Sequence, residues 1–313
     1  MTTAIFSHPE CKRHEMGHWH PESPARLQAI EDQLIASRID GLLEYREAPE
    51  ADLADIRRVH SQSAVERIRN NVQSLLIAGG DYYPLDADTL LNRHSWDAAL
   101  RAAGAAVAAT DAVIDGEVEN AFCAIRPPGH HARPTEAMGF CLFGNVAIAA
   151  KHALEVRGLE RVAIVDFDVH HGNGTEEAFL NDPRVLMVSF FQHPFYPYSA
   201  VLEDVPNMVN LPVPAYTKGN DIRKLVEDKW LPALHAHRPQ MVFISAGFDA
   251  HREDDLGQMG LVEADYAWMT QRIMEVAQEH AQGRIVSCVE GGYNLSALAR
   301  SVVAHVKALA SID

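Results

Sequence analysis

The sequence is poor in basic residues, in cysteine and in long apolar runs. Among its 313 residues, 27 are Lys or Arg and 43 are Asp or Glu, which gives a net charge of −16. A protein that grips the phosphate backbone needs a basic surface, so this balance argues against direct nucleic-acid binding. The acidic surplus fits either a cationic substrate or an ordinary acidic, soluble protein.

Cysteine shows no pairing motif. No C-x-x-C pair occurs, and most of the cysteines lie in apolar surroundings, where buried free thiols are common; they are Cys11, Cys123, Cys141 and Cys288. This usage predicts a reducing compartment. The chain does not open with a basic segment followed by an apolar one, and no run approaches the roughly 20 apolar residues of a membrane helix. We therefore expect a cytoplasmic protein with no membrane partner.

The order of apolar segments predicts the fold class. Repeats and linker-like stretches are lacking, so residues 1–313 are expected to form one domain. Continuous apolar runs predict buried parallel strands at Ala121–Ile125, Arg161–Val165, Met241–Ser245, Arg284–Val289, Val185–Phe190 and near Ala4–Ser7. Helical patterns lie between them, at Trp96–Ile114 with Ser95 as N-cap, Asn145–Val156, Asp221–His235 and Glu263–His280. This alternation predicts an α/β fold with helices on both faces of a parallel sheet.

Polar or glycine-rich clusters follow the four clearest strands. They are Arg126–Ala132, Asp166–Thr175, Ala246–Ala250 and Glu290–Asn294. Ligands of open parallel sheets bind outside the carboxyl ends of the strands, so these clusters would meet at one edge. Turn formation alone explains the glycines, but it explains aspartates, a His-His pair and a tyrosine poorly.

The segment from Asp166 to His171 indicates a metal site. Continued strand geometry would place Asp166, Asp168 and His170 on one face. A carboxylate and an imidazole two residues apart can reach one divalent ion, and zinc accepts such N/O ligands, as does ferrous iron. Asp249, just past another strand, is the best candidate for a third ligand, and Asp166 would support a histidine from behind. Alone, a D-x-H pattern more often reflects turn or capping aspartates.

Two further motifs carry groups suited to acid–base chemistry. Prolines and a glycine fix the approach of His130 and His131, and a histidine can cycle protons near neutral pH. Tyr293 follows two glycines and could polarise a carbonyl, although a buried tyrosine is also an ordinary core residue. The histidines near the N-terminus (His8, His14, His18 and His20) lack a matching carboxylate pattern, so loop or surface roles are favoured over a second metal. His235, His237 and His280 are expected at helix ends.

These motifs together resemble a known family. RPPGHHA, DFDVHHGNGT, SAGFDAHREDDLG and EGGYNLSAL resemble the zinc-dependent histone deacetylase family, including its bacterial deacetylase-like and acetylpolyamine amidohydrolase members. HPESPAR (His20–Arg26) and RVHS (Arg58–Ser61) resemble its N-terminal motifs, so the resemblance runs from about Phe6 to Ser296. It implies the arginase-like three-layer α/β/α fold, with a mostly parallel sheet of about eight strands.

The resemblance also implies a role for each matching residue. Zinc would be held by Asp168, His170 and Asp249; His131 would be the general base and acid, His130 its charge-stabilising neighbour with Asp166 behind it, and Tyr293 the residue that polarises the amide carbonyl. The acyl-lysine tunnel would comprise Phe140, Tyr196, Leu256, Gly139, Gly291 and Gly292. Structural potassium would lie at Asp166, Asp168, His170, Ser189 and Phe190, with a second ion near Phe179, Asp182 and Val185.

Three departures from the family pattern bear on this interpretation. Asn173 stands where one branch has an aspartate behind the second histidine, an exchange typical of the class II-like branch. Tyr196 replaces the more usual phenylalanine of the tunnel wall. Leu256 aligns with a gatekeeper position that is acidic in polyamine-specific relatives, so leucine argues for an acyl-lysine substrate, although Glu253, Asp254 and Asp255 beside it are acidic.

The leading hypothesis is a zinc-dependent deacetylase that acts on acetylated lysine in proteins or peptides. A second reading keeps the chemistry but takes an acetylpolyamine or another small acetylated amine. Two others are an arginase-like ureohydrolase with two manganese ions and a catalytically silent acyl-lysine binder. The sequence does not fix the oligomeric state and leaves a homo-oligomer open.

Overall fold

The computed structural model describes residues 2–202 and 204–312. Its main element is an eight-stranded sheet in which all neighbouring strands are parallel. The strands follow the order β2 (Glu44–Glu47), β1 (Thr3–Ser7), β5 (Asn120–Cys123), β10 (Ile285–Val289), β9 (Val242–Ala246), β6 (Val162–Asp166), β7 (Val185–Gln192) and β8 (Met208–Val213). A short antiparallel pair, β3 (Tyr83–Pro84) and β4 (Leu90–Leu91), is separate from this sheet.

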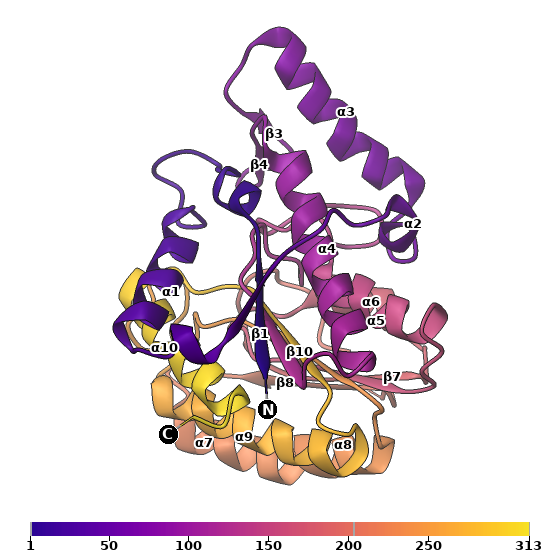
Figure 1. Cartoon of the computed structure of the whole chain (residues 1–313), viewed down its shortest axis with the longest axis vertical. Coiled ribbons are helices and arrows are strands. Elements are labelled where there is room, and N and C mark those ends of the chain that lie inside the picture. The colour runs from indigo at the N-terminus through magenta and orange to yellow at the C-terminus, as the bar shows by residue number, and fades with distance from the viewer. Residues whose placement is uncertain (1, 203, 313) are drawn as a thin grey trace.

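Helices cover both faces of the sheet and complete three layers (Figure 1). On one face lie α4 (Ser95–Ile114) and α5 (Asn145–Glu155), which contact the central strands. The opposite face is covered by α1 (Ala25–Ala36), α7 (Gly219–Leu225), α8 (Leu231–His237), α9 (Glu263–His280) and α10 (Leu295–Leu309). Beyond the sheet, at the top of Figure 1, α3 (Gln62–Ala78) lies beside β3. The short helices α2 (Leu53–Ile56) and α6 (Asn173–Phe179) lie in the connections.

Burial explains why the central strands read as continuous apolar runs. Every residue of β6, β9 and β10 is buried, because helices cover both faces of a parallel sheet. The six predicted strands are all present, within a few residues of their expected bounds. The predicted α/β architecture with an eight-stranded parallel sheet is therefore confirmed.

The alanine-rich sequence of α4 allows close packing. A side chain at Gly104 would overlap the backbone of Pro49 and Ala51, so the helix passes that segment at a distance that only glycine permits. The predicted N-cap of this helix is one residue off. His94 is the cap, and Ser95 is the first helical residue, whose Oγ accepts a hydrogen bond from the Asn92 N–H at 2.7 Å.

The predicted helix over 221–235 contains a local irregularity. The chain is helical from α7 through α8, but residues Val226–Trp230 form a π-helical turn. Pro232, the second residue of α8, has no N–H to donate to the preceding turn, which accounts for the change of hydrogen-bonding register there. The four cysteines are free and buried, as expected.

Candidate metal centre and active site

The four polar clusters follow four strands that lie side by side. β5, β10, β9 and β6 are consecutive in the middle of the sheet. Their carboxyl ends therefore place the clusters at one edge, as the sequence predicted. A group of three potential ligands lies there: one ligand atom each from Asp168, His170 and Asp249, all within 4.8 Å of one another.

The geometry of this group suits a divalent ion. His170 Nδ1 lies 3.0 Å from Asp168 Oδ1 and 3.2 Å from Asp249 Oδ2. Both aspartates are fully buried, yet Asp249 Oδ2 has no hydrogen-bond partner among the described residues. A buried carboxylate oxygen without a partner is costly, and a metal ligand bond would remove that cost. The donor set therefore fits a zinc-type N/O site.

Glycines keep the space around the carboxylates free. A Cβ at Gly291 would overlap Asp249 Oδ2, and a Cβ at Gly247 would overlap Asp168 Oδ2. The Gly291 N–H also donates to Asp168 Oδ2 at 2.8 Å. Gly291 thus holds a candidate ligand carboxylate, and the place in the substrate tunnel that the resemblance implied for it stays a prediction.

The strand that carries the D-x-H pattern ends earlier than the phasing argument assumed. β6 stops at Asp166, but the alternation continues, because Phe167 and Val169 belong to the apolar core whereas Asp168 and His170 belong to the ligand group. The turn is held by Asp166 Oδ1, which accepts from the Asp168 N–H at 3.1 Å, and by Asp168 Oδ1, which accepts from the His170 N–H at 2.8 Å. Asp168 and His170 therefore reach the same side without regular strand geometry.

The two adjacent histidines have different partners. His130 Nδ1 lies 3.0 Å from Asp166 Oδ2, whereas His131 Nδ1 lies 2.8 Å from the amide oxygen Oδ1 of Asn173. Burial disfavours a charged His130, but Asp168 and Asp166 outweigh it and raise its pKa well above the usual value. Burial, together with His130 and His170, lowers the pKa of His131 well below the usual value. One ring is thus held as a cation and the other as a neutral base.

Tyr293 faces the same cavity with its hydroxyl protonated. Burial, assisted by the charge of Asp249, raises its pKa well above the usual value. Its backbone N–H donates to Asp254 Oδ2 at 2.6 Å, and the Arg26 guanidinium lies 5.1 Å from the centre of its ring. The tyrosine is therefore fixed on both sides, and it can act as a hydrogen-bond donor at neutral pH.

A cavity of about 250 Å³ leads to these groups. It is lined by residues that the sequence singled out, namely His131, Gly139, Phe140, His170, Tyr196, Leu256 and Tyr293. Asp255, noted only as an acidic neighbour of Leu256, also lines it, as do Asp88, Phe195 and Tyr198, which the sequence did not indicate. The Tyr196 ring stands perpendicular to that of His131 at 5.2 Å, and Phe195 stacks on His170 at 5.4 Å. Gly139 and Phe140 both have positive φ, and a side chain at Gly139 would strike the His131 ring.

Several positioning residues escaped the sequence analysis. Glu290 Oε2 accepts from the N–H groups of Gly129 and His130 at 2.7 and 3.1 Å, which fixes the turn before the histidine pair. Arg26 donates through Nε to the Gly292 carbonyl at 2.6 Å and through Nη1 to Glu22 at 3.0 Å. The HPESPAR motif contains Glu22 and Arg26, so the signal was present, but only the fold shows what they hold.

The remaining histidines that the sequence analysis singled out lie away from this centre. The four N-terminal histidines all lie in loops or turns, which agrees with the loop or surface roles expected for them; His18 is exposed, whereas His14 and His20 are buried. His235 and His237 lie in the last turn of α8 and His280 ends α9, as expected; His235, Glu279 and His280 form a second, mostly exposed group of ligand-type side chains. Because α8 and α9 end just before β9 and β10 begin, this group lies at the opposite edge of the sheet.

The first of the two potassium positions implied by the resemblance lies beside the metal centre, whereas the second lies where β7 begins, toward the opposite edge of the sheet. Ser189 pairs with Asp166 in the β6–β7 register, and its hydroxyl donates to Asn210 Oδ1 at 2.8 Å. At the second position, the carbonyl oxygens of Phe179, Asp182 and Val185 all accept hydrogen bonds from the side-chain amide of Asn207.

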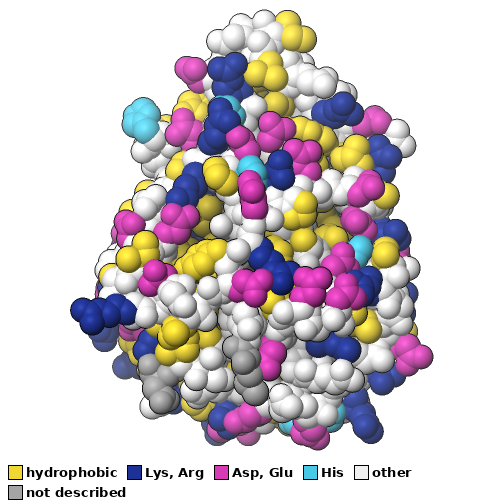
Figure 2. Space-filling view, in the orientation of Figure 1, with side chains coloured by type: hydrophobic (Ala, Val, Ile, Leu, Met, Phe, Trp, Pro, Cys, Tyr) yellow, Lys and Arg dark blue, Asp and Glu magenta, His cyan; other side chains and the backbone are white. Residues whose placement is uncertain are grey.

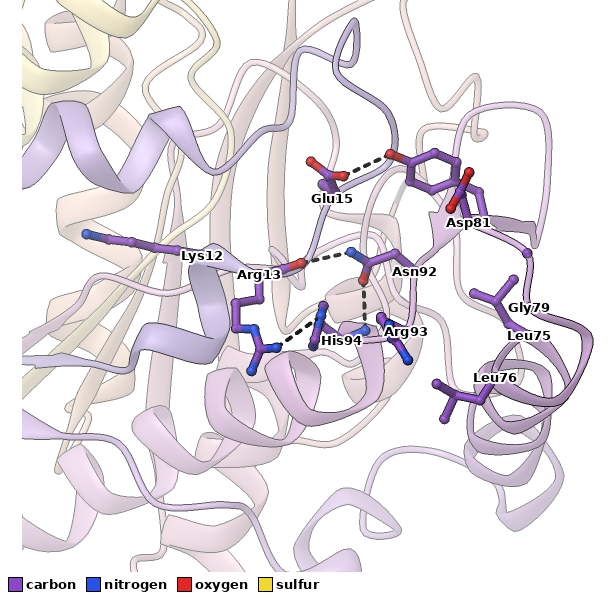
Figure 3. A pocket seen from close by; sticks show the side chains of 12 residues that line it. Lys12, Arg13, Glu15, Leu75, Leu76, Gly79, Asp81, Asn92, Arg93 and His94 are labelled. Atoms are coloured by element: carbon purple, nitrogen blue, oxygen red, sulfur yellow. Dashed lines mark hydrogen bonds between the residues drawn. The ribbon is translucent and has the colours of Figure 1, made fainter.

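A larger cavity, of about 480 Å³, lies between residues 12–15, the end of α3 and the start of α4 (Figure 3). Its polar groups satisfy one another: the Tyr82 hydroxyl donates to Glu15 at 2.9 Å, and Asn92 Nδ2 donates to the Arg13 carbonyl at 2.8 Å. They converge on no common point, unlike the groups of the smaller cavity.

On the face of the molecule shown in Figure 2, acidic and basic side chains are interspersed. Within residues 2–202 and 204–312, no helix has the length and apolarity that a membrane span requires.

Known proteins resemble this chain along nearly its full length. A model of the histone deacetylase domain matches residues 20–309. The chain is 37% identical over 325 residues to a probable deacetylase of Archaeoglobus fulgidus, covering 100% of this chain and 88% of that protein. It is 39% identical over 282 residues to a histone deacetylase-like amidohydrolase of Pseudomonas aeruginosa, covering 88% and 73%. The crystal structure of the HDA15 HD domain matches with a TM-score of 0.92 at 34% identity, covering 99% of this chain and 88% of that one.

Proposed function

Because this chain belongs to the histone deacetylase domain family, we propose that it is a zinc-dependent amidohydrolase that removes acetyl groups from the ε-amine of lysine in proteins or peptides. The observation that carries the proposal is the placement of the ligand group. His170 lines the same cavity as His131 and Tyr293, and its ligand atom lies within 4.8 Å of those of Asp168 and Asp249, so the ligand group adjoins the cavity.

The shape of the cavity favours an acyl-lysine side chain. Phe140 and Tyr196 supply aromatic walls for a chain of methylene groups, and Leu256 adds an apolar contact. An amide that reaches the base would meet the ligand group, His131 and Tyr293 together. A bound zinc ion would supply Lewis-acid polarisation of the carbonyl and would lower the pKa of water there.

The chain's own residues then account for the proton transfers. Tyr293 donates a hydrogen bond to the amide oxygen as negative charge develops on it. His131, neutral because of its surroundings, accepts the proton of the attacking water and later delivers it to the leaving amine. His130 remains charged beside Asp166 and stabilises the developing negative charge. The products are acetate and a free lysine amine.

A second substrate class is supported by one observation. Asp88 and Asp255 line the same cavity as Leu256, so two carboxyl groups are available to an ammonium group of a small acetylated polyamine. The two classes are separated by kcat/KM for an acetyl-lysine peptide against acetylputrescine and acetylspermidine. Faster turnover of the polyamines would overturn the peptide proposal.

Metal identity is tested by reconstitution. We expect activity on the acetyl-lysine peptide to return when metal-free protein receives one equivalent of Zn²⁺, with Fe²⁺ as the alternative ion for this N/O donor set. An arginase-like enzyme would instead need two manganese ions and would release urea. A silent acyl-lysine binder would retain the peptide without cleaving it.

The remaining expectations are proposals of the same kind. A structural potassium ion would involve Asp166, Asp168, His170, Ser189 and Phe190. Two other expectations likewise stay predictions from the sequence: a cytoplasmic location and a single-domain organisation over residues 1–313. The homo-oligomer that the sequence leaves open has the same standing.

A further inference from the structure

The connection between α6 and β7 forms a cradle of three backbone carbonyls. Asn207 Nδ2 donates to the carbonyl oxygens of Phe179 at 2.9 Å, Asp182 at 3.1 Å and Val185 at 3.1 Å. Asn207 immediately precedes β8 and is buried. Its own carbonyl accepts from the Met187 N–H at 2.9 Å, which ties the residue to β7.

These three carbonyls belong to the three residues near which the family resemblance implied a second potassium ion. Converging carbonyl oxygens without a positive partner repel one another, and they need either a cation or hydrogen-bond donors. The amide group of Asn207 supplies two N–H bonds to the three acceptors, so one hydrogen is shared between two oxygens. Its nitrogen occupies the point at which the oxygens converge.

We propose that Asn207 replaces this second cation, so that a protein amide holds the α6–β7 connection without an ion. The three distances of 2.9, 3.1 and 3.1 Å leave no space for a cation between the carbonyl oxygens and Nδ2. A cation could enter only if the side chain left the cradle or presented Oδ1 in place of Nδ2. The cradle therefore does not fit potassium while Asn207 is in place, which revises the expectation for Phe179, Asp182 and Val185.

The proposal concerns this cradle alone. The site expected at Asp166 and Ser189 is built from other residues, and it can bind potassium whether or not Asn207 fills the second position. Replacing Asn207 by alanine should leave three carbonyls without a donor and recreate an oxygen-lined site for a monovalent cation.

Crystals of the zinc-loaded protein grown in RbCl provide the direct test, because Rb⁺ substitutes for K⁺ and is located by its anomalous scattering. We expect no anomalous peak among the carbonyls of Phe179, Asp182 and Val185 in the wild-type protein, and a peak there in Asn207→Ala. A peak at that point in the wild-type protein, with the Asn207 side chain turned away or inverted, would overturn the proposal.

Thermal unfolding gives a second measurement that does not depend on crystals of the variant. The gain in Tm on replacing choline chloride by KCl at equal ionic strength should be larger for Asn207→Ala than for wild type. The matched control is Asn120→Ala, which removes a buried amide that donates to a single carbonyl, that of Leu309, at 2.9 Å. Equal KCl gains in all three proteins would contradict the proposal, whereas folding of Asn207→Ala only in KCl would support it.

Discussion

Replacing Asn173 by aspartate should move the pH dependence of the proposed deacetylase to higher pH. The side chain of Asn173 accepts from His131 Nδ1 at 2.8 Å, so Asn173→Asp would place a carboxylate against the proposed base without changing its size. The acid limb of kcat/KM reports the pKa of that base, because a protonated His131 cannot accept a proton from water. A neighbouring negative charge stabilises the protonated form and therefore raises this pKa.

The size of the shift follows from the distance and the exposure. Two unit charges about 4 Å apart interact by about 4 kcal/mol at an effective dielectric constant of about 20, which corresponds to about 3 pKa units as an upper limit. Asn173 is half-buried and lines a second, open cavity, so solvent screens part of the interaction. We expect the acid limb to rise by about 1–2 units, the lower part of the range for charge pairs at this distance.

The assay is the rate of acetyl-lysine peptide cleavage between pH 5 and 9, on zinc-loaded protein. Asn173→Ala is the neutral control: it removes the hydrogen bond to His131 without adding charge, so activity should fall but the acid limb should not rise. An unchanged acid limb in a folded, zinc-loaded Asn173→Asp would refute the assignment of His131 as the titrating base.

Three further predictions test other parts of the site. Tyr293→Phe should lower kcat by about 10²–10³-fold with little change in zinc content, and a near-normal rate would exclude its role as donor to the amide oxygen. Asp249→Ala should lose most of its bound zinc by elemental analysis, and its Tm should no longer respond to a chelator; retained stoichiometric zinc would contradict the ligand assignment. Burial opposes the charge of Glu22, but Arg126 and Arg26 outweigh it and lower its pKa to about 2, so the stability that this carboxylate contributes is present above its unfolded pKa near 4.5 and lost as the pH falls toward 2. Glu22→Gln should therefore destabilise the fold by about 3–5 kcal/mol at pH 7 and by progressively less between pH 4.5 and 2 in denaturant titrations, and an equal loss at both ends would count against the ion pair.

The central sheet and the site could be read from the sequence for the same physical reason. Strands buried on both faces are continuous apolar runs, and the residues just after them are forced to one edge, so Asp168 and Asp249 could be brought together without knowledge of the strand order. The edge strands were harder to find. β2 alternates between half-buried and exposed residues and β8 is largely half-buried, so neither is a continuous apolar run, and such short strands resemble loops.

The contacts that fix the proposed catalytic groups could not be predicted in the same way. The link between Arg26 and Gly292 joins residues 266 positions apart, and that between Glu290 and Gly129 spans 161 positions. No local periodicity reports such contacts. The Asp254 carboxylate accepts a hydrogen bond from the Tyr293 backbone N–H at 2.6 Å. In the sequence, Asp254 was noticed only as one of a run of acidic residues near the tunnel. Asn207 gave no signal, because its role depends on where three distant carbonyls converge.

The different behaviour of His130 and His131 arises from the packing around two chemically identical neighbours. Their ring centres are 4.0 Å apart, so protonation of one opposes protonation of the other. Asp166 and Asp168 both face His130, while the partner of His131 is a neutral amide. The first proton is therefore held on His130, and its charge keeps His131 free to accept the second. On the proposed reaction, an asparagine behind His131 has a purpose: it orients the ring through one hydrogen bond and leaves its basicity to be set by His130, whereas a carboxylate at residue 173 would compete with Asp166 for the same proton.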